Sequence, residues 1–181
     1  GDDYVAAAGP SGAPPRSEHL RRVGPVLVAR RAPREHVPWV LVSIVTPAID
    51  EEEEIPFRAR ELEAQEPPWE WIVADGGSVD RTIPNARRLG ARVVESRRGR
   101  GPQLNAGAGA AHGDVFLFLH ADTRIPAGAL SVLRRALADE AVVGGHFSLR
   151  FGEGSLTDRL FTSCYALQER LFGIFYGDSA M

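Results

Sequence analysis

The chain has 181 residues, of which 44% are hydrophobic and 25% are charged, and its formal net charge is −3 at pH 7. These values are typical of one globular domain with a buried core, and the charge argues against a protein that coats nucleic acid. The single cysteine, Cys164, excludes an internal disulfide, and no run reaches the ~18 apolar residues of a membrane span. No signal peptide is visible, so we expect a cytoplasmic protein.

The N-terminal segment, residues 1–37, is rich in Gly, Pro, Ala and Arg. Its run at 9–15 is typical of flexible or extended chain. Residues 26–28 are compatible with a short strand. We therefore expect a flexible segment at 1–37 and a folded domain at 38–181.

Strand-like and helix-like segments alternate from Pro38 onward. Residues 39–46 form a continuous apolar run with β-branched side chains, which is typical of a strand buried on both faces. The other predicted elements, in chain order, are a helix ending at 65, a strand at 69–74, a helix at 80–89, a strand at 92–95, a helix at 102–111, a strand at 115–119, a helix at 126–138, a strand within 141–151 and a helix at 155–175. This alternation predicts a Rossmann-like α/β fold, with a mostly parallel central sheet flanked by helices.

Ligands of such sheets bind beyond the carboxyl ends of the strands. Asp122 follows the strand predicted at 115–119. A lone carboxylate there is costly unless it is paired or holds a cation, and Mg²⁺ often uses one or two carboxylates plus substrate phosphates. Asp122 can equally cap the helix that starts near Pro126, and the residues alone leave both readings open.

Two other turns follow strands and carry carboxylates. Asp75 precedes Gly76 and Gly77, which permit a sharp turn and close approach of a ligand, and Asp75 can accept from a ribose hydroxyl or a base N–H. Asp80 is better interpreted as a helix N-cap. The carboxylates at 50–52 can bind a nucleoside or form a solvated helix start.

An arginine-rich loop at 97–100 precedes the helix predicted at 102–111. Guanidinium groups at a helix N-terminus make a site for an anion such as a diphosphate. We assign this role to Arg100 and interpret Arg97 as solvated.

The ordered set of motifs resembles the family 2 glycosyltransferases of the GT-A fold. The matching segments are Pro47-Ala48-Ile49-Asp50-Glu51-Glu52, Asp75-Gly76-Gly77-Ser78-Val79-Asp80-Arg81-Thr82, Gly99-Arg100 with Asn105-Ala106-Gly107, and His120-Ala121-Asp122. The resemblance covers about residues 40–181 and is closest to a bacterial subgroup that also carries Tyr-Gly-Asp, here 176–178. The chain departs from the family at Asp50, usually Asn, at His120, usually Asp, and at Ser179, usually Gln.

The resemblance implies transfer of a sugar from a UDP- or GDP-linked donor to an acceptor hydroxyl, with inversion and with Mn²⁺ or Mg²⁺. It implies that Glu51 and Asp75 hold the nucleoside, that Arg100 lies near the diphosphate, and that Asp122 binds the metal. The other residues it implies are His120 as a second metal ligand and Pro47, Ala48, Gly76, Gln103, Asn105 and Ala121 in the nucleotide-sugar site. Asp178 is either the general base or a structural or acceptor-binding carboxylate.

Two other functions compete with this one. A nucleotidyltransferase that makes nucleotide sugars needs a Gly-rich, basic phosphate loop directly after the first strand, where this chain has residues 47–50. A catalytically inactive sugar-nucleotide-binding domain is favoured by His120 and by the chain's early end, from which we expect an acceptor-binding region to be missing. Gly107 and Gly109 precede a strand, so we interpret them as close helix packing and not as a dinucleotide loop.

The apolar helix predicted at 155–175 has three candidate roles. We favour core packing or a homodimer contact over peripheral contact with a membrane, because its polar face carries few arginines.

Overall fold

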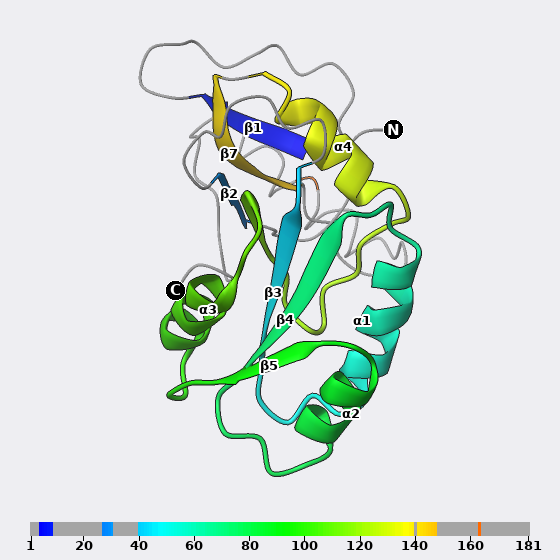
Figure 1. Ribbon diagram of the computed structural model, residues 1–181, viewed down its shortest axis with the longest axis vertical. Coiled ribbons are helices and arrows are strands. Elements are labelled where there is room, and N and C mark those ends of the chain that lie inside the picture. Colours follow the sequence, from blue (N-terminus) through cyan, green and yellow to red (C-terminus); the bar gives the residue numbers. More distant parts are fainter. Residues whose placement is uncertain (1–3, 9–26, 31–39, 140, 148–162, 164–181) are drawn as a thin grey trace.

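A computed structural model of the protein describes residues 4–8, 27–30, 40–139, 141–147 and 163. Its centre is a seven-stranded sheet in the order β1-β7-β2-β6-β3-β4-β5 (Figure 1). The strands are β1 (Tyr4–Ala8), β2 (Leu27–Arg30), β3 (Val42–Ala48), β4 (Trp69–Asp75), β5 (Arg92–Glu95), β6 (Val115–Phe118) and β7 (Val142–Phe147). The helices are α1 (Glu54–Glu63), α2 (Thr82–Arg88), α3 (Arg100–Ala110) and α4 (Ala129–Ala136).

The strands β6, β3, β4 and β5 are parallel neighbours, which confirms the predicted α/β fold. Every residue of β3 is buried, as its continuous apolar run predicts. β3 pairs with β4 from Val42↔Trp69 to Ala48↔Asp75, so the two strands end at the same edge of the sheet. β6 runs parallel to β3 on its other side. The loops that follow β3, β4 and β6 therefore leave the sheet at one edge.

The strands β1, β2 and β7 extend the sheet with antiparallel pairs. β1 and β2 lie within residues 1–37, where the sequence predicts flexible chain with a possible strand only at 26–28. The difference arises because a strand added to a sheet is held by backbone hydrogen bonds, which leave little trace in composition. The predicted domain boundary at residue 38 stays a prediction.

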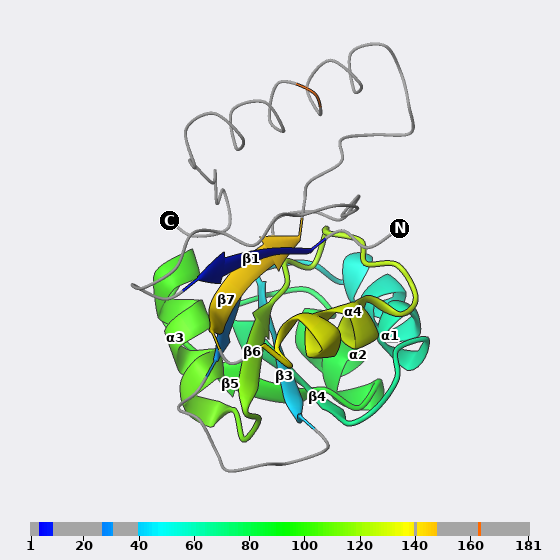
Figure 2. The ribbon, with the colours of Figure 1, turned by 90° about the horizontal axis from the view of Figure 1, so that it is seen from above.

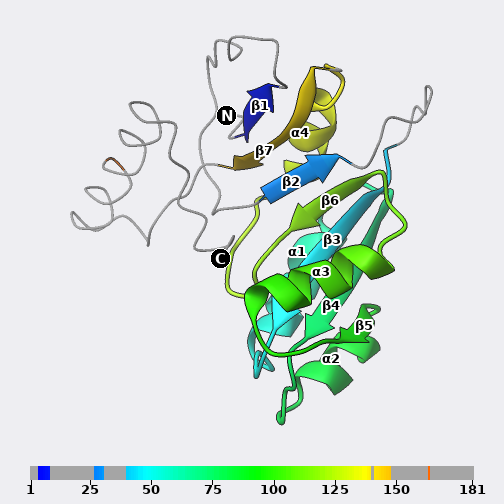
Figure 3. The same ribbon diagram turned by 90° about the vertical axis from the view of Figure 1, so that its left-hand side faces the viewer.

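The helices cover both faces of the sheet. α3 lies on one face, and α1, α2 and α4 lie on the other (Figures 2 and 3). The larger apolar cluster lies under α1, α2 and α4, and a smaller one around Val45 and Ile72 lies under α3. A Cβ atom at Gly107 would lie 2.3 Å from Val45 Cγ1, which confirms close helix packing at Gly107, whereas a Cβ at Gly109 would meet open space.

The helix predicted at 155–175 falls almost wholly outside the described residues. Ser163 is described and is helical; Cys164 and Asp178 lie outside. Within the part of the chain that the structure describes, no helix has the length and apolarity needed to cross a membrane.

Candidate functional site

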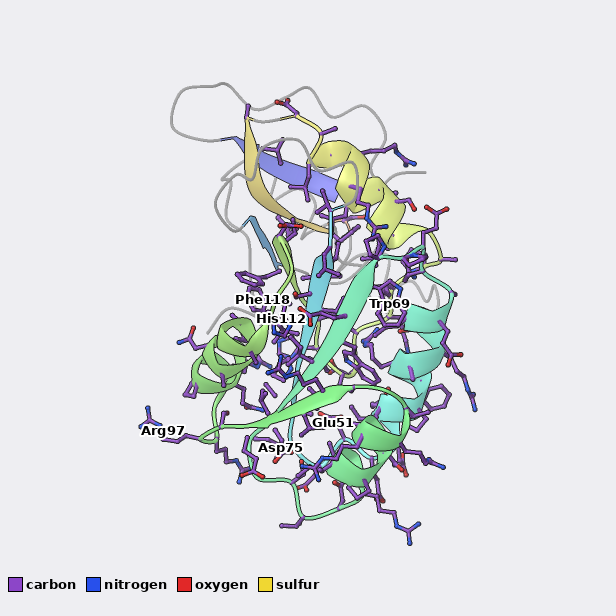
Figure 4. All side chains as sticks on the ribbon, in the orientation of Figure 1. Glu51, Trp69, Asp75, Arg97, His112 and Phe118 are labelled. Carbon is purple, nitrogen blue, oxygen red and sulfur yellow. The ribbon has the colours of Figure 1, made fainter. Side chains whose placement is uncertain are left out.

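Three loops meet at the carboxyl edge of the parallel strands. Residues 49–52 follow β3 and residues 76–82 follow β4; we call them the paired loops. Residues 120–124 come after β6 and form the Asp122 loop. Figure 4 shows Glu51 and Asp75 at this end of the sheet, and Arg97 pointing outward from the loop before α3. The exposed position of Arg97 agrees with its interpretation as a solvated side chain.

The paired loops are joined by side chains that accept backbone N–H groups. Three consecutive N–H groups of the first loop donate to three side chains of the second. The pairs are Asp50 to Ser78 Oγ (3.0 Å), Glu51 to Thr82 Oγ1 (2.7 Å) and Glu52 to Asp80 Oδ2 (3.0 Å). Asp80 also accepts the N–H of Thr82 at 2.8 Å, at the start of α2. The N-cap residue of α2 is Arg81 and not Asp80 as predicted, because the helix begins at Thr82.

Asp50 supports this junction from the other side. Its φ angle is 54°, in the left-handed region that Asp and Asn enter more readily than other non-glycine residues. Its Oδ1 atom accepts the N–H of Val79 at 2.8 Å. The backbone conformation and the bond suit aspartate and asparagine alike, so this position accepts Asp50 in place of Asn without loss of the junction.

The Asp75 side chain forms hydrogen bonds within the turn that it begins. Its side chain accepts hydrogen bonds from the N–H of Gly77 at 2.8 Å and from the Oγ of Ser78 at 2.5 Å, and the residue is only 2% exposed. The glycine at 76 is needed for space, because a Cβ there would lie 2.7 Å from the side chain of Ile49. Asp75 therefore shapes the turn, and its contact with a nucleoside stays a prediction.

Gln103 ties the ends of β3 and β4 together from α3. Its side chain is buried, and Nε2 donates to the carbonyls of Ala48 and Ala74 at 2.9 Å each. These bonds give Gln103 a structural role at the base of the paired loops. The other residues predicted for the nucleotide-sugar site divide by exposure: Pro47, Ala48, Gly76 and Ala121 are buried, and Arg100 and Asn105 are exposed on α3. Direct contact of any of them with a nucleotide sugar stays a prediction.

Glu51 and Asp122 bring two carboxylates from different loops within electrostatic range. The pKa of Glu51 is raised, first by burial and then by the negative charge of Asp122. Asp122 itself is exposed. Within the described residues, no three His, Cys, Asp or Glu side chains form a metal-binding group. The donor set fits Mn²⁺ or Mg²⁺ held by one or two carboxylates together with ligand phosphates, and does not fit a closed protein cage.

His120 lies in the same loop, in a half-buried position. Its Nε2 atom is buried and not presented to solvent, and its backbone carbonyl accepts a hydrogen bond from Arg58. Of the two metal ligands predicted from sequence, Asp122 is therefore the more open, and ligation by His120 stays a prediction.

Arg58 is a site residue that the sequence motifs do not predict. It lies on α1, and its guanidinium group reaches the Asp122 loop, where Nη2 donates to backbone carbonyls. Burial lowers the pKa of Arg58 to about 10, so the group is charged at neutral pH. The available signal was its spacing, because Arg58 shares the buried face of α1 with Ile55, Ala59 and Leu62.

Comparisons with known proteins place the chain in a family. Residues 43–175 match the family described as Glycosyl transferase family 2. No curated protein matches the sequence.

Among solved structures, the chain is similar to the mannosyltransferase PcManGT from Pyrobaculum calidifontis in complex with GDP-Man and Mn²⁺, with 27% identity and a TM-score of 0.51 over 57% of this chain and 36% of that one. It is also similar to glucosyl-3-phosphoglycerate synthase from Mycobacterium tuberculosis in complex with Mn²⁺, UDP and glucosyl-3-phosphoglycerate, with 32% identity and a TM-score of 0.42 over 46% of this chain and 34% of that one. The chain thus spans about a third of the length of these structures.

Proposed function

The chain belongs to glycosyl transferase family 2, and on this premise we propose that it is the donor-binding part of a metal-dependent glycosyltransferase. The reaction is transfer of a sugar from a nucleoside diphosphate to an acceptor hydroxyl. The observation that carries the proposal is the family match over residues 43–175, which includes Glu51 and Asp122 on loops at the carboxyl edge of the sheet. Two carboxylates repel each other there unless a cation or a bound ligand offsets their charge.

The donor would lie across the three loops. Asp122, with His120 as the second candidate, would hold Mn²⁺ or Mg²⁺, which supplies positive charge for the diphosphate leaving group. Arg100 stands at the N-terminus of α3 and is exposed, where guanidinium and helix dipole both favour a diphosphate. Glu51 and Asp75 would face the nucleoside. The Pyrobaculum relative, with GDP-Man and Mn²⁺, supports a nucleotide-sugar donor and Mn²⁺.

The rest of the reaction depends on residues outside the described part of the chain. Attack of the acceptor oxygen on the anomeric carbon, opposite the leaving diphosphate, inverts its configuration and requires removal of the hydroxyl proton. Asp178 is the proposed base for that proton. The identity of the acceptor, a homodimer and a cytoplasmic location with or without membrane contact stay predictions.

The paired loops weigh against a nucleotidyltransferase. That activity needs free backbone N–H groups or basic side chains after the first strand to hold phosphates. Here the N–H groups of Asp50, Glu51 and Glu52 already donate to side chains of the second loop. This observation favours a donor site in which the first loop meets the nucleoside.

Calorimetric titration of UDP and GDP, with and without Mn²⁺, tests the proposal. We expect one nucleotide to bind more tightly with Mn²⁺, and this enhancement to disappear in Asp122→Ala. Glu63→Ala is the matched control, because Glu63 is an exposed carboxylate on α1 and its loss changes net charge by the same amount. Absence of binding by either nucleotide would overturn the donor-site proposal.

Metal-dependent hydrolysis of the corresponding nucleotide sugar separates an enzyme from an inactive binding domain. Release of free sugar by the wild-type chain, lost in Asp122→Ala, supports the enzyme. Nucleotide binding without any hydrolysis or transfer supports the inactive domain.

A further inference from the structure

The most unusual side chain near the site is Arg58. It is 0% exposed and belongs to the largest fully buried side chains of the described residues. Taking a guanidinium group out of water is costly, and an apolar side chain of similar volume often stabilises such a position equally well or better. Within the described residues its Nε atom has no hydrogen-bond partner, which adds to the cost. Stability alone is therefore a poor account of an arginine here.

The contacts of Arg58 converge on one loop. Its Nη2 atom donates to the carbonyl of His120 at 2.6 Å, to that of Ala121 at 3.3 Å, and also to that of Thr123. Its Nη1 atom donates to Glu61 at 2.5 Å, a partner on the same helix that offsets the charge. The carbonyls belong to the residues on either side of Asp122. Carbonyl dipoles that point at one place repel each other, so a cation between them sets the shape of the loop.

The same helix holds the far end of the loop by a second contact. Arg124 pairs with Glu54 at 2.7 Å, and its guanidinium lies 5.0 Å from the centre of the Phe57 ring. Two hydrogen bonds inside the loop are long, namely Thr123 N–H to the His120 carbonyl at 3.2 Å and Thr123 Oγ1 to Asp122 at 3.5 Å. Side chains of α1 thus contact the Asp122 loop both around Asp122 and at Arg124.

We propose that Arg58 is a positioning residue for the metal site: by binding the carbonyls of His120, Ala121 and Thr123, it holds the loop in the conformation that presents Asp122 to a divalent cation. This inference rests on the proposed function of the same edge of the sheet. Arg58 touches neither cation nor donor, and it acts through the backbone of the loop. Residues that orient metal ligands in this way typically change metal affinity about 10- to 100-fold when they are replaced.

The test compares Arg58→Met, Arg58→Lys and Arg134→Met with the wild-type chain. Arg134 is a matched control, because it also donates to three backbone carbonyls, those of Val40, Glu66 and Pro68, at the opposite edge of the sheet. The first readout is the ratio of nucleotide affinity with Mn²⁺ to that without it. The second is amide hydrogen exchange of residues 120–124 in the metal-free protein, with urea unfolding measured in parallel.

We expect the Mn²⁺ ratio to fall about 10-fold or more in Arg58→Met and by less in Arg58→Lys, which keeps the charge but not the fork of donors. In the metal-free protein, amide exchange at 120–124 should rise most in Arg58→Met and less in Arg58→Lys. Arg134→Met should lower the unfolding midpoint and leave both loop readouts unchanged. Arg124→Met removes the second anchor at a half-exposed position and should raise loop exchange without loss of folding, which keeps the loop readout available if Arg58→Met does not fold.

Unchanged amide exchange at 120–124 in both Arg58 variants would overturn the inference. It would also be overturned if Arg134→Met lost the Mn²⁺ enhancement of nucleotide affinity to the degree that it lost stability. Failure of the proposed function looks different. In that case the wild-type chain binds nucleotide equally well with and without Mn²⁺, or does not bind it. Amide exchange of the loop without metal then still decides whether Arg58 positions the loop.

Discussion

The paired loops and the Asp122 loop end at the same edge of one sheet, yet they are held in different ways. The paired loops hold each other: short polar side chains of one accept backbone N–H groups of the other. In the Asp122 loop it is the backbone carbonyls that need donors, and a side chain of α1 supplies them. A loop that exposes N–H groups is stabilised by Ser, Thr and Asp, whereas a loop that exposes carbonyls needs a donor such as Arg.

This difference changes how the motif at 75–82 is interpreted. From sequence its polar residues are candidates for ligand contact. In the structure Ser78, Asp80 and Thr82 are acceptors for the neighbouring loop, and Asp75 closes its own turn. Much of the motif therefore builds the rim of the site, and contact of Glu51, Asp75 and Asp122 with a ligand stays a prediction.

The largest loss of stability should come from disturbing the packing of α3 against β3, the strand that precedes the first of the paired loops. Gly107→Ala places a Cβ atom 2.3 Å from Val45 Cγ1 and must push α3, with Gln103, away from the ends of β3 and β4. We expect a loss of about 1–3 kcal/mol in the free energy of unfolding, measured in urea.

The control for this change lies two residues further along the same helix. A Cβ at Gly109 meets nothing within 4 Å, so Gly109→Ala should be neutral or stabilise by up to about 1 kcal/mol. Equal losses in both variants would contradict the close packing assigned to Gly107.

Thr82→Val tests whether the loops are held independently. The Thr82 side chain is buried, and its hydroxyl accepts the Glu51 N–H at 2.7 Å. Valine keeps the volume and leaves that N–H without a partner, at a cost of about 1–3 kcal/mol. Hydrogen exchange at Glu51 should rise while that at 120–124 stays unchanged, and Thr82→Ser should restore the wild-type value. A matching rise at both loops would mean that they form one cooperative unit.

Asp80 makes the strength of the junction between the paired loops depend on pH, and Asp80→Asn removes that dependence. Burial raises the pKa of Asp80, but hydrogen bonds from the side chain and backbone of Thr82 and the backbone of Glu52 outweigh it, and the pKa lies below its ordinary value. A lowered pKa means that Asp80 stabilises the fold above the unfolded-state pKa of about 4, and that this contribution is lost as pH falls through the folded-state value.

We therefore expect Asp80→Asn to lose about 0.5–1 kcal/mol at neutral pH, a small value because solvent screens the site. In urea titrations the difference from wild type should shrink below about pH 4. A difference that is constant with pH would show that the charge of Asp80 plays no part.

The smallest expected effect is on the electrostatic interaction between Glu51 of the paired loops and Asp122 of the Asp122 loop. Asp122→Asn removes one of the negative charges that raise the pKa of Glu51, so that pKa should fall but stay above its ordinary value, because burial is the larger cause. Titration of the Glu51 side-chain carboxyl by NMR measures the shift, with Glu63→Gln on α1 as the control. A Glu51 pKa that does not move would place the two carboxylates too far apart to share a ligand.

The sequence predicts the central parallel sheet and its helices well, because each element has its own periodicity or end signal. The predicted strand at 92–95 agrees with β5, and the helices at 80–89 and 126–138 shorten only at their ends. It does not predict β1, whose residues Tyr4–Ala8 gain their conformation by pairing with β7, far along the chain. It also does not predict that the Gln103 amide donates to the carbonyls of Ala48 and Ala74, and contact of Gln103 with a nucleotide sugar stays a prediction.

What the sequence by itself determined is the order of strands and helices, the edge of the sheet where the loops gather, and the family with its candidate carboxylates. These follow from local patterns of apolar residues, turns and caps, which each segment carries within itself. Only the tertiary structure decided which N–H groups are already occupied, which carboxylates approach each other, and that Arg58 on α1 holds a loop 62 residues away. Such contacts depend on how α1 lies against the loop that follows β6, and no local pattern encodes the distance between them.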